Sequence, residues 1–198
     1  MANGRITHLH SQRSHSWVRN AYNCVLTQLA GINCDGTYAA GSTGMKQIGG
    51  TVASGKAQGL LREDLTCEDP TTLANGLVSP AATIYGIAVG SNNTAESFED
   101  YKINTKIAHG NAAGQLSYGQ SLYPATKSYV AGTKTYTAIH TRYFNNNSGG
   151  DVTVRECTIE MQNQSTVYCT CRDVFADVVV PNTGQLKVTY TFTLTYPA

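Results

Sequence analysis

The spacing of apolar residues predicts one helix near the N-terminus of the chain. After a polar stretch, the apolar side chains between residues 16 and 30 recur at intervals of three and four, as on one helical face. Ser14 or Ser16 can cap its start, and Gly31 stands where such a helix would end. The residues of this predicted face, with the flanking tryptophan, are Trp17, Val18, Tyr22, Val25, Leu26 and Leu29.

The period changes to two from residue 82 onward, which is typical of strands. The last segment is the clearest, because Val188, Tyr190, Phe192 and Leu194 alternate with threonines. The expected strand segments are residues 82–90, 97–107, 115–123, 127–144, 151–161, 167–180 and 185–196. We expect NNNSGGD (145–151) and PNTG (181–184) to be hairpin turns, since Asn and Gly tolerate positive φ.

This pattern predicts a mainly β fold with three parts along the chain. Residues 1–30 would form an N-terminal arm and the amphipathic helix. Residues 31–80 are rich in Gly, Ser and Thr and carry too few large apolar groups for a core of their own, so we expect an extended region lying over other surfaces. Residues 81–198 would form an antiparallel β-sandwich, jelly-roll-like, of about seven or eight strands.

Composition and charge narrow the classes of partner. The formal net charge is +1 and only 14% of residues are charged, so nucleic acid is not expected as the main partner. No stretch approaches the length of a membrane span, and the N-terminus lacks the apolar region of a secretory signal. We therefore expect synthesis in the cytoplasm, no membrane partner, and cysteines that stay reduced.

Three of the six cysteines stand out as candidate structural thiols. Cys169 and Cys171 lie one residue apart in a predicted strand, so they would share one face, at a separation unfavourable for a mutual disulfide. Cys157 lies in the preceding strand and could sit across from either one. Packed thiols are the favoured interpretation, while a cross-strand disulfide and, last, a metal site remain the alternatives.

Other chemistry-bearing residues do not form a recognisable site. His8, His10 and His15 belong to a polar stretch without a carboxylate. Glu99 and Asp100 are neighbours, and neighbouring side chains in a strand diverge. We expect no catalytic residues, no bound metal and no cofactor.

Three segments, covering about residues 84–196, carry a resemblance to a known group of proteins. They are YGIAVGSNNTAESFEDYKINTKIAHG, RYFNNNSGGDVTVRE and CRDVFADVVVPNTGQLKVTYTFTLTY. Their order is similar to that in uncharacterised virion proteins of tailed phages. In that group an R-x-F-x-N-x-S-G turn precedes I-T-V-x-E, and A-R-D-V precedes a C-terminal strand. Here Cys157, Cys169 and Cys171 stand where the group tends to have apolar or small residues.

The resemblance implies a structural role in a phage particle. The protein would be a non-enzymatic, multi-copy virion component that decorates or cements the capsid, or belongs to the tail or neck. Its partners would be other copies of itself and the major capsid or tail proteins, and its location the virion. The predicted helix face would then be an assembly surface, unless it covers the sandwich of its own chain.

A binding module is the alternative from a different class. A lectin-like β-sandwich could recognise carbohydrate or a host receptor through tyrosine-rich loops such as SYGQSLYP and TKSY. No Asp/Asn pattern of a calcium-binding loop accompanies these segments.

Overall fold

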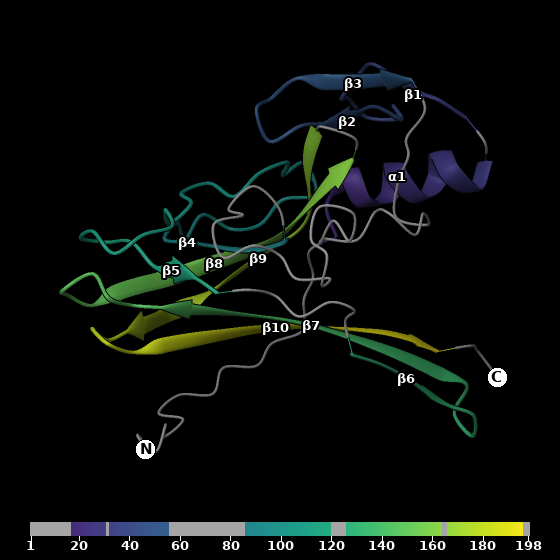
Figure 1. Ribbon diagram of the computed structural model, residues 1–198. Helices are drawn as coiled ribbons and strands as arrows, with labels where there is room; N and C mark the ends of the chain where they lie inside the picture. Colours follow the sequence, from purple (N-terminus) through teal and green to yellow (C-terminus); the bar gives the residue numbers. More distant parts are fainter. Residues whose placement is uncertain (1–16, 31, 56–85, 120–125, 164–165, 196–198) are drawn as a thin grey trace, which may run out of the picture.

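The computed structural model describes residues 17–30, 32–55, 86–119, 126–163 and 166–195. Within these ranges the fold is mainly β, with one helix and three antiparallel sheets (Figure 1). The helix, α1, spans Arg19–Ala30, so it begins three residues later than the sequence predicts. Residues 1–15, expected to be the N-terminal arm, lie outside the described residues.

A small three-stranded sheet lies beside α1. Its strands, in the order β1-β3-β2, are β1 (Cys34–Asp35), β3 (Val52–Gly55) and β2 (Met45–Lys46). Its apolar cluster combines Cys34 and Met45 with Cys24 from α1 and Tyr168 from a strand of another sheet. The described part of the Gly/Ser-rich region therefore relies on other elements for its burial.

Two larger sheets form the body of the molecule, one above the other in Figure 1. The first has the order β4-β8-β9 and comprises β4 (Gly86–Gly90), β8 (Val152–Asn163) and β9 (Thr166–Val180). The second has β7 at its centre, with β10 on one side and both β5 and β6 on the other. Its strands are β5 (Ser117–Tyr118), β6 (Thr126–Val130), β7 (Thr135–Asn145) and β10 (Gln185–Thr195).

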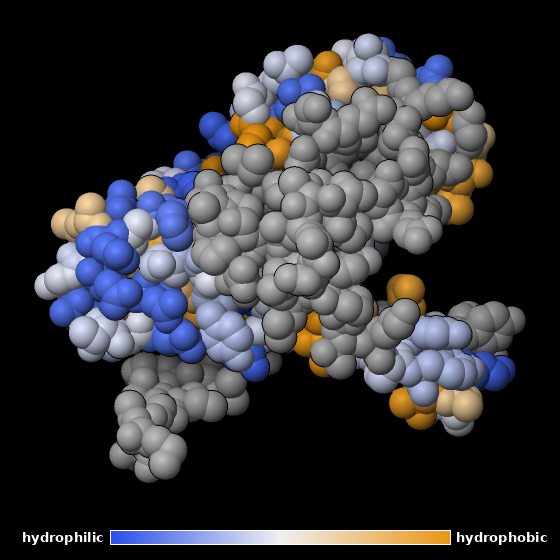
Figure 2. Space-filling view, in the orientation of Figure 1, coloured by the Kyte–Doolittle hydropathy of each residue, from blue (hydrophilic) through white to orange (hydrophobic). Residues whose placement is uncertain are grey.

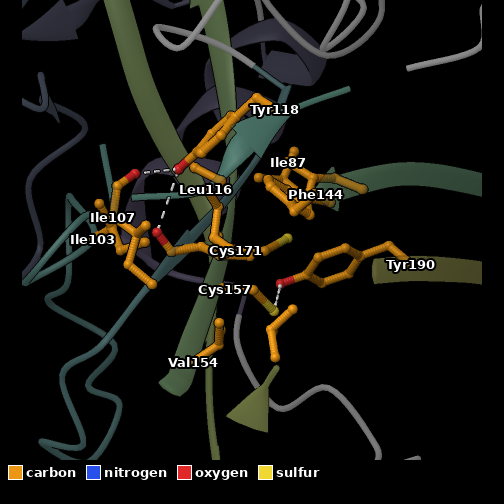
Figure 3. Close-up of a cluster of buried hydrophobic side chains, with 14 of the residues drawn as sticks. Ile87, Ile103, Ile107, Leu116, Tyr118, Phe144, Val154, Cys157, Cys171 and Tyr190 are labelled. Carbon is orange, nitrogen blue, oxygen red and sulfur yellow. Dashed lines mark hydrogen bonds between the residues drawn. The ribbon is translucent and has the colours of Figure 1, made fainter. Parts of the chain in front are cut away.

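These two sheets share one apolar core (Figure 3). The β4-β8-β9 sheet contributes residues such as Ile87 and Ile159, and the β7-β10 pair contributes Phe144 and Tyr190. The Tyr118 hydroxyl donates a hydrogen bond to the Ile107 carbonyl oxygen over 2.6 Å. Burial of these side chains supplies the main driving force for stacking the two sheets.

The turns at 145–151 and 181–184 were predicted as hairpins, and that prediction is wrong. Strand β7 pairs with β10, whereas β8 pairs with β4 and β9, so each turn carries the chain from one sheet to the other. Asn146 joins the two turns, because its amide nitrogen donates to the Val180 carbonyl over 2.7 Å and its backbone carbonyl accepts from the Thr183 N–H. Alternating polarity identifies the buried face of a strand but not its partner.

Two further strand predictions need correction. Residues 127–144 form a hairpin of β6 and β7 rather than one strand, with Lys134 at a φ of 50° in its turn. Residues 97–107 form no strand, and only Lys106 makes an isolated bridge, to Gly90. This segment is instead a loop whose backbone is fixed by hydrogen bonds to buried charged groups, described below.

Candidate assembly surface

Helix α1 is anchored through polar side chains. The Asn20 amide nitrogen donates to the carbonyl oxygens of Lys46 (2.8 Å) and Cys169 (3.0 Å), and its amide oxygen accepts from the Lys46 N–H at 2.8 Å. The Asn23 amide donates to the Gly44 carbonyl at 2.8 Å. Since both asparagines are buried and bonded, the helix is fixed to β9 and to the small sheet by these polar side chains, together with the buried Ala21 and Cys24.

The apolar side of α1 therefore faces outward for most of its length. Tyr22 is 53% exposed, Leu26 51% and Leu29 74%. Their spacing of i, i+4 and i+7 places them in one row along the helix. Figure 2 shows apolar surface at the α1 end of the molecule.

The six predicted assembly residues divide into three groups. Trp17, Tyr22, Leu26 and Leu29 are exposed, whereas Val25 is half-buried. Val18 is buried, and its N–H donates to the Thr170 carbonyl of β9. Val18 therefore belongs to the attachment of the helix rather than to its outer row.

Two exposed residues from outside the helix extend this row. Phe98 lies 5.5 Å from Tyr22 between ring centroids, and Tyr22 lies 6.1 Å from Trp17. Ile32, just beyond the helix, is also exposed. Phe98 is held beside the helix by a hydrogen bond from the Arg19 N–H to the Phe98 carbonyl oxygen. The two residues are far apart in the sequence, so the spacing of apolar residues could not have predicted this contact. We call Trp17, Tyr22, Leu26, Leu29, Ile32 and Phe98 the helix stripe.

The three candidate structural thiols are buried and unbridged, but they are arranged differently from the prediction. Cys157 and Cys171 lie in the core between the sheets, while Cys169 lies outside that cluster. A bulge is responsible, because Ile159 pairs with Cys171 and the next residue, Glu160, pairs with Cys169. Ile159 and Glu160 are adjacent in β8, so their side chains point to opposite faces of the sheet. The cysteines that pair with them, Cys171 and Cys169, therefore also lie on opposite faces. The shared face predicted for Cys169 and Cys171 is wrong.

Burial makes these thiols poor nucleophiles. It raises the pKa of Cys157 to about 12, against a smaller opposing effect of the Tyr190 hydroxyl 3.0 Å away. Burial also raises the pKa of Cys169 well above its ordinary value. Because the thiolate is the reactive species, neither group is activated near neutral pH.

A buried ion cluster fixes the 91–107 loop on the outer face of the β4-β8-β9 sheet. The guanidinium of Arg172, on β9, donates to Glu156 Oε2 at 2.9 Å and to Asp100 Oδ2 at 2.7 Å. Glu156 also accepts the Thr105 N–H at 2.8 Å, and its side chain is fully buried. A second ion pair between β8 and β9, formed by Arg155 and Asp177, lies nearer the solvent.

The charged groups of the cluster bind each other and the backbone, which identifies them as structural. Across the described residues, no group of three or more His, Cys, Asp and Glu side chains could hold a metal ion. His8, His10, His15 and Cys67 lie outside those residues. Nor is any helix of the described chain long and apolar enough to span a membrane.

Comparison of the chain with protein-family models, with curated proteins and with solved structures gave no match.

Proposed function

We propose that this protein is a non-enzymatic structural component of a phage virion, present in multiple copies on the capsid or in the tail or neck. Its partners would be other copies of itself and the major capsid or tail proteins. The helix stripe is the observation that carries this proposal. A helix attached by its polar side, with its apolar side exposed, is typical of a surface that another protein covers.

Burial of the helix stripe would favour association substantially. Full burial of an exposed leucine or aromatic side chain contributes about 1.5–3 kcal/mol. Leu29 is three-quarters exposed and four other stripe residues are about half exposed, so several such contributions are available. They are offset by the loss of rotational and translational freedom on binding, which repeated contacts in a particle reduce for each copy.

The segments that resemble phage virion proteins support the proposal at the level of the fold. Arg142, from the R-x-F-x-N-x-S-G segment, is fully buried and donates to the carbonyl oxygens of Gly119 and Ile87. Asn146 from the same segment joins the two inter-sheet turns, and Arg172 anchors the 91–107 loop. We propose on this basis that the two packed sheets form a jelly-roll-like β-sandwich, as the resemblance implies.

The test is to quantify this protein in purified particles from the phage that encodes it. We expect tens to hundreds of copies per particle by quantitative mass spectrometry. A Leu26→Gln/Leu29→Gln variant should enter particles at a strongly reduced copy number. Ala30→Gln, at an exposed position of the same helix, is the matched control and should assemble normally.

The two possible failures of this test are distinct. Absence of the wild-type protein from particles would sink the virion proposal. Normal incorporation of the double variant would leave the virion proposal standing, and it would show that the helix stripe is not the assembly surface.

A lectin-like carbohydrate-binding module is the second candidate, and one observation favours it. Tyr129 and Tyr136 are about half exposed and stacked, with ring centroids 4.4 Å apart. Exposed aromatic rings of this kind can stack on the apolar face of a sugar. Glycan-array binding by the monomeric protein, abolished by Tyr136→Ala, would favour this function over the structural one.

A further inference from the structure

One end of the second large sheet extends beyond the rest of the molecule. In Figure 1, β6 and the adjoining halves of β7 and β10 project away from the β4-β8-β9 sheet. We call this part, residues 126–139 and 191–195, the β-extension. Its strands are paired throughout, from Thr126↔Ile139 to Val130↔Thr135 and from Thr191↔Ile139 to Thr195↔Thr135. It is therefore ordered sheet rather than a loose loop.

The apolar face of the β-extension continues the core face of the sheet. Along β10, Val188, Tyr190 and Phe192 pack on the core, and Leu194 is the next residue on the same side. Leu194 pairs with Tyr136, which in turn pairs with Tyr129 of β6. Further in, this row is covered by the β4-β8-β9 sheet, but Leu194 is 71% exposed and Tyr136 59%. The row of apolar side chains thus runs past the end of its covering layer.

The opposite face of the β-extension has a different character. Thr135 pairs with Thr195 and their hydroxyl groups are hydrogen-bonded at 3.1 Å, with Thr137 and Thr193 next to them in register. Threonine rows of this kind are satisfied by each other and by water. Val130, which pairs with Thr135, is also exposed on this face. The larger uncovered apolar area is on the other face, which the tyrosine pair and Leu194 define.

The chemistry of that face fits a second copy of itself. On β7 and β10 the face of the extension consists of Tyr136, Ala138, Phe192 and Leu194. The register of β6 adds Tyr129 at the tip and places Lys127 beside Ala138. The exposed tip of this face, formed by Tyr129, Tyr136 and Leu194, has no charged member and can pack on an identical tip about a two-fold axis without repulsion. Aromatic rings also associate favourably in offset or edge-to-face arrangements.

The size of the patch sets the strength of this contact. The exposed parts of Tyr129, Tyr136 and Leu194 amount to about 300 Å² per copy, since a fully covered aromatic side chain buries roughly 150–250 Å². This is less than the roughly 800 Å² per partner of a stable interface. Pairing through the patch alone should therefore be reversible and dependent on concentration.

We propose that the β-extension is a self-association surface, on which the apolar face of one copy packs against the same face of a second copy. Each copy thereby supplies the layer that the other lacks. This interface is separate from the helix stripe, so a chain with both surfaces can contact more than one neighbour. The proposal concerns the purified protein and stands or falls independently of its presence in particles.

Site-specific cross-linking tests the proposal in full-length protein with Cys67→Ser as the background. The five described native cysteines are buried. We expect Leu194→Cys to give a covalent dimer with a short bis-maleimide, because position 194 would face its counterpart across the two-fold axis. Thr193→Cys, on the opposite face of the same strand, is the matched control and should give little dimer.

Sedimentation velocity of variants gives an independent measurement. Leu194→Asp should weaken self-association at least about 10-fold, because it places a charge in an apolar contact. Leu194 is mostly exposed, so circular dichroism should show unchanged folding. Thr193→Asp should leave the dissociation constant of the dimer nearly unchanged.

Several outcomes would overturn the proposal. A monomer at all concentrations, with no cross-link at position 194, would do so. Equal cross-linking at positions 193 and 194 would indicate pairing through the edge of β10 instead. Cross-links that form only between Leu194→Cys and Leu29→Cys copies would show that the extension contacts the helix stripe of its neighbour. Glycan binding by a monomer through Tyr136 would assign the patch to carbohydrate.

Discussion

The buried ion cluster allows a sharp prediction about stability. In Glu156→Gln the side chain keeps its shape and one acceptor oxygen, but it loses its charge. The Arg172 guanidinium, which is fully buried, would then retain Asp100 Oδ2 at 2.7 Å and the Thr94 carbonyl at 2.9 Å. One charge-assisted hydrogen bond would weaken, and one of the two backbone N–H groups now bonded to Glu156 would lose its acceptor.

The expected loss follows from these contacts. A hydrogen bond to a charged group contributes about 1.5–3 kcal/mol, and a buried donor left unsatisfied costs about 1–3 kcal/mol. Breaking a buried ion pair typically destabilises a protein by about 3–5 kcal/mol. Because Asp100 still compensates part of the Arg172 charge, we expect the lower end of this range, about 3 kcal/mol. For a chain of this length the melting temperature should fall by roughly 6–12 °C.

Thermal unfolding followed by circular dichroism measures this shift, and the chain contains its own control. Arg155 and Asp177 form a second ion pair between β8 and β9, with Nε–Oδ1 at 2.7 Å, but the Asp177 side chain is 58% exposed. Water screens such a pair, so Asp177→Asn should leave the melting temperature almost unchanged. Equal shifts in Glu156→Gln and Asp177→Asn would refute the reasoning, because burial would then make no difference to the pair.

Three further predictions concern Gly90, Cys157 and His140. Gly90→Ala should lower the free energy of unfolding, measured in a urea titration, by about 2–3 kcal/mol, because a Cβ there would lie 2.5 Å from Glu156 Oε1. Gly132→Ala is the control and should be neutral, since a Cβ at that position meets no atom within 4 Å. Burial raises the pKa of Cys157 to about 12, so the thiol loses its proton more readily in the unfolded chain. The free energy of unfolding should therefore decrease between about pH 9 and pH 12, and Cys157→Ala should flatten that part of the stability–pH curve. Burial lowers the pKa of His140, so as the pH falls the imidazole is protonated in the unfolded chain before it is protonated in the folded one. The free energy of unfolding should therefore decrease below about pH 6.5, and His140→Gln should reduce its difference between about pH 7.5 and 5.5.

The sequence predicted correctly that the chain is mainly β with one helix, and it predicted strand pairing poorly. Alternation along residues 185–195 identified β10 and its buried face, because one side of the strand packs on the core. Strand β7 pairs with β10 instead of β8 through contacts between residues 40 to 60 positions apart, from Asn145↔Gln185 to Thr135↔Thr195. Alternation gives no signal for such pairing. The loop at 97–107 was mistaken for a strand because Ile103 and Ile107 fill the edge of the core at a spacing that mimics alternation.

The helix shows a different kind of error. Spacing identifies its apolar row, but the same spacing fits two orientations, with the row toward a partner or toward the predicted sandwich of the same chain. The structure exposes the row because Asn20 and Asn23 bond to carbonyl oxygens of neighbouring elements. An asparagine that binds backbone looks in sequence like any surface asparagine. Likewise, the bulge that separates Cys169 from Cys171 has no sequence signature that we recognise.

The two exposed apolar surfaces have a common structural basis. In the helix, polar side chains make the attachment to the body, and in the β-extension, backbone hydrogen bonds between strands do so. In both places the exposed apolar side chains are therefore not needed to hold the element in position, and the apolar part of the helix attachment comes from the buried Val18, Ala21 and Cys24. Because the formal net charge of the chain is only +1, long-range electrostatic attraction offers little guidance to association. Specific assembly would instead depend on the shape of these two surfaces, and the rigid attachment of each makes that shape reproducible from copy to copy.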